Sequence, residues 1–210
     1  MDLSGLRAQV DALQPRDRMW PAPHADRTPL QEEYSRCLNP GKYRVLHERL
    51  QLWAAVVVER GLGRVEPARG AVWRDPFPEQ DRATETPTAT WWLRPWSTSA
   101  LPLLVVAHGR EGGVEVGAGD PAVPVVRLPV CGCDACDDGG ALLAGELDDR
   151  VLDVLGGSFT DVRFGDVRVV GVADGWSTTA DLGDQDVERL LADARAGRSP
   201  HHVVHGVPWG

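Results

Sequence analysis

The spacing of apolar residues changes from helical to alternating near residue 91, and this change constrains the fold more than any other feature. Before it, an apolar stripe at helical spacing predicts a helix that begins near Pro40 and ends at Gly61. After it, the period is two, as in half-buried strands. The strands predicted there are 91–96, 101–107, 114–118 and 123–130.

The remaining elements complete an α+β pattern. Apolar residues at helical spacing predict a helix from about residue 138 to Gly156, and Gly165-Asp166 is typical of a tight hairpin. A last helix is expected from Asp184, with a short edge strand near Val203. Because the strands follow one another as hairpins instead of alternating with helices, we predict a mostly antiparallel sheet with helices packed on one face.

Three segments are expected along the chain. Residues 1–63 form an N-terminal helical part, with further helices predicted over 3–13 and just after Thr28. Residues 64–90 form a Pro-rich connection, and residues 91–210 hold the antiparallel sheet with two helices. A length of 210 residues suits one compact domain with a core of its own.

The charge and the hydropathy exclude two classes of partner. A net charge of −9 argues against nucleic-acid binding, which depends on clustered Lys and Arg. No segment approaches the length of a membrane span, and the N-terminus does not resemble a secretion signal. We therefore expect a cytoplasmic protein with reduced thiols, whose partner is a protein and neither a nucleic acid nor a membrane.

Cys131, Cys133 and Cys136 form a C-x-C-x-x-C group between a predicted strand and a predicted helix. Three soft ligands in one loop are typical of a zinc site, and zinc needs a fourth ligand. The sequence leaves that ligand open among five candidates. They are Cys37, His108, His205, Asp134 and Asp137.

Two other interpretations of the same loop stay open. The cysteines could be small buried apolar residues with the aspartates as helix caps. Alternatively, Cys133 and Cys136 could form a redox dithiol before a helix, as in thioredoxin-like proteins. Carboxylates beside the sulfurs raise thiol pKa values, which disfavours the redox interpretation and suits a bound cation better.

Other side chains give weaker indications of a site. His201 and His205 would share one face of an extended strand, but a partly exposed terminal segment is the simpler interpretation. Trp91, Trp92 and Trp96 could form a stacking platform, although core packing is favoured. The sequence shows neither a Gly-rich phosphate loop nor a nucleophile elbow.

Two blocks of sequence resemble a known family. They are the residues 26–44, with Asp26-Arg27-Thr28-Pro29 and Asn39-Pro40, and the run 129–137, PVCGCDACD. Together with the ending His205-Gly206-Val207-Pro208-Trp209, they are similar to an uncharacterised actinobacterial domain-of-unknown-function family of cytoplasmic proteins. The resemblance implies no activity or substrate. It makes the three-cysteine block a hallmark of the family but not Cys37, which is thereby a doubtful metal ligand.

The sequence thus predicts an α+β binding or regulatory module without a catalytic cycle of its own. Its metal ligands would be Cys131, Cys133 and Cys136, and its cofactor zinc. One alternative is a metal- or thiol-dependent enzyme that uses the same loop. Another is an acidic inhibitor of a basic partner protein, which follows from the net charge alone.

Overall fold

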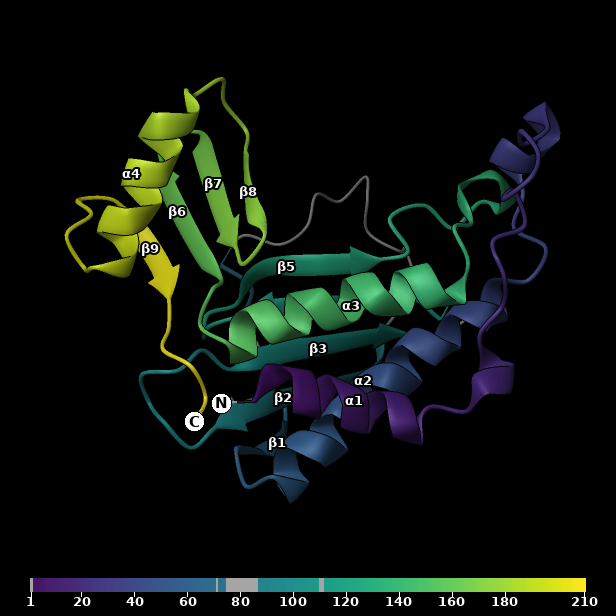
Figure 1. The fold of residues 1–210 in the computed structure, drawn as a ribbon, viewed down its shortest axis with the longest axis horizontal. Helices are drawn as coiled ribbons and strands as arrows, with labels where there is room; N and C mark the ends of the chain where they lie inside the picture. Colours follow the sequence, from purple (N-terminus) through teal and green to yellow (C-terminus); the bar gives the residue numbers. More distant parts are fainter. Residues whose placement is uncertain (1, 71, 75–86, 110–111) are drawn as a thin grey trace.

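The computed structural model describes residues 2–70, 72–74, 87–109 and 112–210, and it confirms the α+β class with antiparallel sheets. The strands divide into a five-stranded sheet with helices on one face and a four-stranded sheet against which one helix packs (Figure 1). The larger sheet has the order β1 (Gly63–Pro67), β2 (Pro87–Pro95), β3 (Leu103–His108), β4 (Val114–Ala118) and β5 (Val123–Leu128). The smaller has the order β8 (Gly175–Thr178), β7 (Val167–Val172), β6 (Thr160–Phe164) and β9 (His202–His205).

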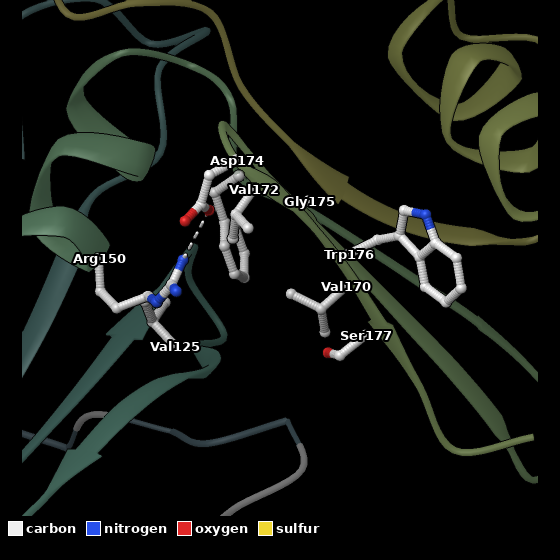
Figure 2. A pocket seen from close by; sticks show the side chains of 9 residues that line it. Val125, Arg150, Val170, Val172, Asp174, Gly175, Trp176 and Ser177 are labelled. Carbon is white, nitrogen blue, oxygen red and sulfur yellow. Dashed lines mark ion pairs between the residues drawn. The ribbon is translucent and has the colours of Figure 1, made fainter. Parts of the chain in front are cut away.

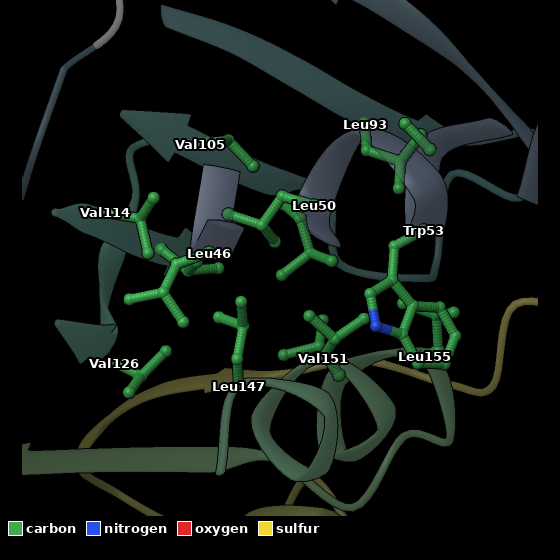
Figure 3. Packing of buried hydrophobic residues seen from close by; sticks show 14 of the residues in the cluster. Leu46, Leu50, Trp53, Leu93, Val105, Val114, Val126, Leu147, Val151 and Leu155 are labelled. Carbon is green, nitrogen blue, oxygen red and sulfur yellow. The ribbon is translucent and has the colours of Figure 1, made fainter. Parts of the chain in front are cut away.

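Three helices lie on one side of the larger sheet: α2 (Arg44–Glu59) and α3 (Gly140–Leu155) contact its strands, and α1 (Leu3–Leu13) packs against these two helices. The predicted stripe of α2 is confirmed, because Leu46, Leu50 and Trp53 are buried against strand residues and against α3 (Figure 3). On this face β3 and β4 contribute alternate residues such as Val105 and Val114, as expected for period-two strands.

A buried ion network links the three helices. The carboxylate of Asp148 in α3 is 1 % exposed and accepts hydrogen bonds from Arg49 Nε at 2.9 Å and from Trp53 Nε1 at 2.6 Å. Arg49, itself 3 % exposed, also pairs with Asp11 of α1. Each polar group therefore has a partner on another helix, as a buried charge requires.

The smaller sheet packs against α4 (Asp184–Arg195) and has a small core of its own, around Val162, Val169 and Leu191. Its Gly165-Asp166 hairpin is confirmed by the pairing of Phe164 with Val167. The Arg168 guanidinium donates to the carbonyl of Pro124 in β5 at 2.6 Å and so joins this sheet to the larger one.

Two N-terminal segments differ from the sequence prediction in detail. β1 occupies the start of the predicted connection 64–90, beginning one residue before it, and pairs with β2 from Gly63↔Pro95 to Pro67↔Trp91. Edge strands need few apolar residues, which is why its pattern gave no signal. The short helix expected after Thr28 is a 3₁₀ helix over Gln31–Ser35, in which Leu30 N donates to Glu33 Oε2 at 2.6 Å. Residues 71 and 75–86 of the predicted connection lie outside the described part.

Within the described residues, no helix is long and apolar enough to cross a membrane.

Candidate metal centre

The three cysteines lie in the loop that joins β5, an edge strand, to α3. Their Sγ atoms all lie within 4.8 Å of one another, and those of Cys131 and Cys133 are 3.2 Å apart. A 3₁₀ turn over Asp134–Cys136 produces this convergence, with Cys136 N donating to the carbonyl of Cys133 at 3.2 Å. The structure therefore brings the three residues of the C-x-C-x-x-C group together.

The sulfur spacing suits a tetrahedral metal ion. Zinc–sulfur bonds of about 2.3 Å place tetrahedral sulfurs about 3.8 Å apart, within the range of the observed separations. Cys131 and Cys136 are exposed, Cys133 is half-buried, and the three form no disulfide. An ion could thus reach the sulfurs from solvent, and the interpretation as buried apolar cysteines is not supported.

The pKa values of the Cys133 and Cys136 thiols are shifted in opposite directions. Burial works against the Cys133 thiolate, but hydrogen bonds from Cys131, Cys136 and nearby backbone N–H groups outweigh it and lower the Cys133 pKa. The hydrogen bond to Cys133 in turn raises the pKa of Cys136 to about 12, with burial acting in the same direction. Without a cation, one negative charge on the cluster therefore opposes the next.

Asp137 is occupied by donors from the chain itself. Its buried carboxylate accepts Trp20 Nε1 at 2.8 Å and Gly139 N at 3.0 Å, and it pairs with Lys42. Lys42 also lies 5.0 Å from the centroid of the Tyr43 ring. Asp137 thus fixes the start of α3 to two distant segments and is not available as a metal ligand without breaking these contacts.

Asp134 is occupied in the same way. Its Oδ1 accepts the backbone N–H of Leu38 at 3.1 Å, and its Oδ2 accepts Arg36 Nε at 3.2 Å. Its own N–H donates to the carbonyl of Arg36 at 2.8 Å, and its carbonyl contacts His24 Nε2 at 2.8 Å. We name residues 129–139, together with residues 31–43 that pack against them, the cysteine lobe; it lies beyond one end of the larger sheet (Figure 1).

Tyr43 lies at the base of the cysteine lobe, next to α2. Burial raises the pKa of its hydroxyl most, and the negative charges of Asp137, Cys37, Asp134 and Cys131 raise it further. Its ring meets that of Trp20 edge-on, with centroids 5.7 Å apart. The lobe is therefore attached to the helical layer through aromatic packing as well as through ion pairs.

The two histidine candidates do not join the cysteines. His205 belongs to β9, where its Nδ1 contacts Thr160 Oγ1 and the Phe159 carbonyl, each at 3.1 Å. His108 ends β3 and lies 3.7 Å from the Glu115 carboxylate, buried on the face of the larger sheet opposite the helices. Both are thus held by other parts of the fold.

The residues that position the lobe were not found by sequence reasoning. Trp20, Arg36 and Lys42 have no motif of their own, and their contacts with Asp134 and Asp137 cross about a hundred positions of sequence. One weak signal was present, because Lys42 is the sole lysine and follows Asn39-Pro40 in the same block as Tyr43.

The tryptophan strand is mainly structural. Trp91 packs against the main core, and Trp92 is buried on the opposite face, with the Arg94 guanidinium 4.5 Å from its ring centroid. Trp96 is exposed, and the Arg64 guanidinium lies 4.9 Å from its ring centroid. The three rings therefore do not form one stacking platform, and the favoured core interpretation holds for Trp91 and Trp92 but not for the exposed Trp96.

A separate cavity of about 350 Å³ lies where the two sheets meet (Figure 2). Val125 and Val170 give it apolar walls, and Arg150 contributes its guanidinium. That group already pairs with Asp153 at 2.7 Å and with Asp174 at 3.9 Å. The lining residues include none from the cysteine lobe, so the cavity and the sulfurs do not form one site.

The comparisons with known proteins place the chain in a family without giving it an activity. The model of a family of unknown function, DUF6226, matches residues 9–210, and the chain therefore belongs to that family. Neither the curated proteins nor the solved structures contain a match.

Proposed function

We propose that this member of the DUF6226 family is a non-catalytic binding or regulatory module whose cysteine lobe is stabilised by zinc. The ion would be held by Cys131, Cys133 and Cys136. The observation that carries the proposal is the convergence of their three sulfurs within 4.8 Å on the molecular surface. Thiolates are soft ligands that favour zinc over magnesium or calcium, and a reducing cytoplasm would keep them available.

A structural role fits the surroundings of the sulfurs better than a catalytic one. Asp134 and Asp137, the acidic groups nearest in sequence, are occupied by Arg36, Lys42 and backbone donors. A general base must be able to reach a substrate proton, and these carboxylates are directed into the fold. Zinc here would fix the corner between β5 and α3, as structural zinc sites do.

The partner would be a protein that contacts the cysteine lobe. Val130 and Leu38 are 79 % and 76 % exposed, the highest values for large apolar side chains in the described part of the chain. They come from the two segments of the lobe, and Leu38 N is bonded to Asp134. Exposed apolar groups on an ordered support are typical of interaction surfaces.

Metal analysis of protein purified without added metal tests the zinc site. We expect about one zinc per chain in the natural protein. Cys133→Ser should lose this zinc and should melt at a lower temperature. Gly132→Ser is the matched control, since a Cβ at Gly132 meets no atom within 4 Å and the sulfurs are retained. Absence of stoichiometric zinc, with unchanged melting of Cys133→Ser, would refute the proposal.

Thiol alkylation separates this function from the enzyme alternative. Zinc-bound thiols should react slowly until a chelator is added, whereas a redox dithiol would contain one fast-reacting thiolate in untreated protein. For the acidic-inhibitor alternative, a basic partner should dissociate as salt is raised. A partner that is retained in high salt but lost in Leu38→Ser would instead support apolar docking on the lobe.

A further inference from the structure

We propose that Cys37 supplies the fourth ligand, so that the metal centre is a closed four-thiolate site joining the two segments of the cysteine lobe. This inference rests on the zinc site proposed above. It reverses the expectation from the family resemblance, in which Cys37 was a doubtful ligand. It also removes the open coordination position that metal catalysis would need.

The backbone on both sides of Cys37 is fixed to the cysteine loop. Asp134 N donates to the carbonyl of Arg36 at 2.8 Å, and Leu38 N donates to Asp134 Oδ1 at 3.1 Å. Asp134 directly follows Cys133 in the sequence. Cys37 is therefore held opposite the turn that carries the other three cysteines, although about a hundred residues separate them.

The side chain of Cys37 is exposed, and the negative charges of Cys37 and Cys131 both raise the pKa of the Tyr43 hydroxyl. The Cys37 sulfur is not one of the three within 4.8 Å, so metal binding requires its side chain to turn toward them. The free energy of the metal–thiolate bond would offset the cost of this movement.

The carboxylate candidates for the fourth ligand already have partners, and the two histidine candidates belong to other parts of the fold. Asp134 and Asp137 accept hydrogen bonds on both carboxylate oxygens. His205 and His108 lie in the two sheets. The remaining competitor is His24, whose Nε2 contacts the Asp134 carbonyl while its buried Nδ1 has no hydrogen-bond partner in the described part of the chain.

His24 is a weaker candidate than Cys37 because its Nε2 already contacts the Asp134 carbonyl and its Nδ1 is buried, whereas Cys37, Cys131 and Cys136 are exposed. A histidine ligand would also give a site of mixed donors, whose cobalt spectrum differs from that of four thiolates. The two assignments can therefore be separated by one spectroscopic experiment.

Cobalt(II) titration of the metal-free chain tests the assignment. We expect thiolate charge-transfer absorption that falls by about a quarter in Cys37→Ser, with cobalt affinity weakened more than about tenfold. His24→Asn should leave the spectrum unchanged. An unaltered spectrum in Cys37→Ser would refute the proposal, and a changed one in His24→Asn alone would assign the ligand to His24.

A second measurement does not depend on whether the variants fold. In the zinc-loaded natural chain, mass spectrometry after brief alkylation should find Cys37 protected together with the other three cysteines, and all four modified after chelation. Rapid modification of Cys37 alone, with zinc retained, would overturn the four-thiolate site but leave the three-cysteine zinc site intact. If the natural chain binds neither cobalt nor zinc, the proposed function fails as well.

Discussion

The Asp148 network of the helical layer and the cysteine lobe both join segments that are far apart in sequence. They differ in which of their polar groups have partners within the chain. In the helical layer, Asp148 is 1 % exposed and Arg49 3 %, and each has its partners on neighbouring helices. In the lobe, Asp134 and Asp137 likewise have chain partners, whereas the sulfurs lie at the surface with one another as neighbours.

This difference shows where an added ligand would act. A buried ion pair whose hydrogen bonds are all made gains nothing from an added ligand. Removing one of its partners leaves a buried charge without compensation. The carboxylates of the lobe are equally complete, so the sulfurs are the groups whose interactions a metal would improve. The comparison can be tested by removing one carboxylate from each region.

The largest effect is expected for Asp148→Asn. The substitution removes the negative charge that faces Arg49 in the helical layer, and loss of one partner from a buried pair costs about 3–5 kcal/mol. Urea unfolding measures the loss, which should be equal with zinc and with chelator. The control is Asp149→Asn, because Asp149 is 53 % exposed and its pair with Arg7 should contribute less than about 1 kcal/mol.

If Asp148→Asn lowered the free energy of unfolding by less than about 1 kcal/mol, the Asp148–Arg49 pair would not hold the helical layer together. The contrast between the two regions would then be wrong for the helical layer.

A smaller effect, dependent on the metal, is expected for Asp137→Asn in the lobe. The change weakens the contacts to Lys42 and Trp20 and should cost about 1–3 kcal/mol. Because zinc would fix the same loop, the cost should be smaller in zinc than in chelator. Unfolding in both conditions measures this difference, and Asp138→Asn, at an exposed neighbour, is the matched control.

If Asp137→Asn destabilised the chain equally in zinc and in chelator, the metal and the carboxylate would not support the same structure, and the contrast between the two regions would lose its basis.

The sequence predicted the elements whose residues repeat with a clear period. The stripe of α2, the strands β3 to β5 and the hairpin at Gly165 were identified because local spacing determines which side is buried. It also identified Cys131, Cys133 and Cys136 as neighbours, because the turn that gathers them is local.

Contacts across long sequence separations could not be predicted in this way. The Asp148–Arg49 pair, the Asp137–Lys42 pair and the placement of Arg36 beside Asp134 each depend on how distant elements pack. No periodic pattern encodes them. In the sequence, a charged residue that is solvated by water cannot be distinguished from one that pairs with a distant element. The same reason made the aspartates of the lobe appear as candidate metal ligands.

The smallest effect on stability is expected from Glu33, at the edge of the lobe, and this effect should depend on pH. The side-chain hydrogen bond from Arg27, together with the N–H of Leu30, lowers the pKa of Glu33 to about 2. A carboxylate with a lowered pKa stabilises the fold above its ordinary value near 4.5, and this contribution is lost as the pH falls toward 2. Because Arg27 is 46 % exposed, solvent screens the pair.

Glu33→Gln should therefore destabilise the chain slightly at pH 6, and the difference from the natural chain should shrink as the pH is lowered from about 5 to 2. Amide hydrogen exchange of residues 30–38 would measure it, with both chains free of metal so that thiol protonation does not interfere. Glu32→Gln controls for the loss of one negative charge at an exposed neighbour. A difference that stayed constant over this pH range would show that the Arg27 pair does not order the segment carrying Cys37, and that the lobe depends on Asp134 and Asp137 for its shape.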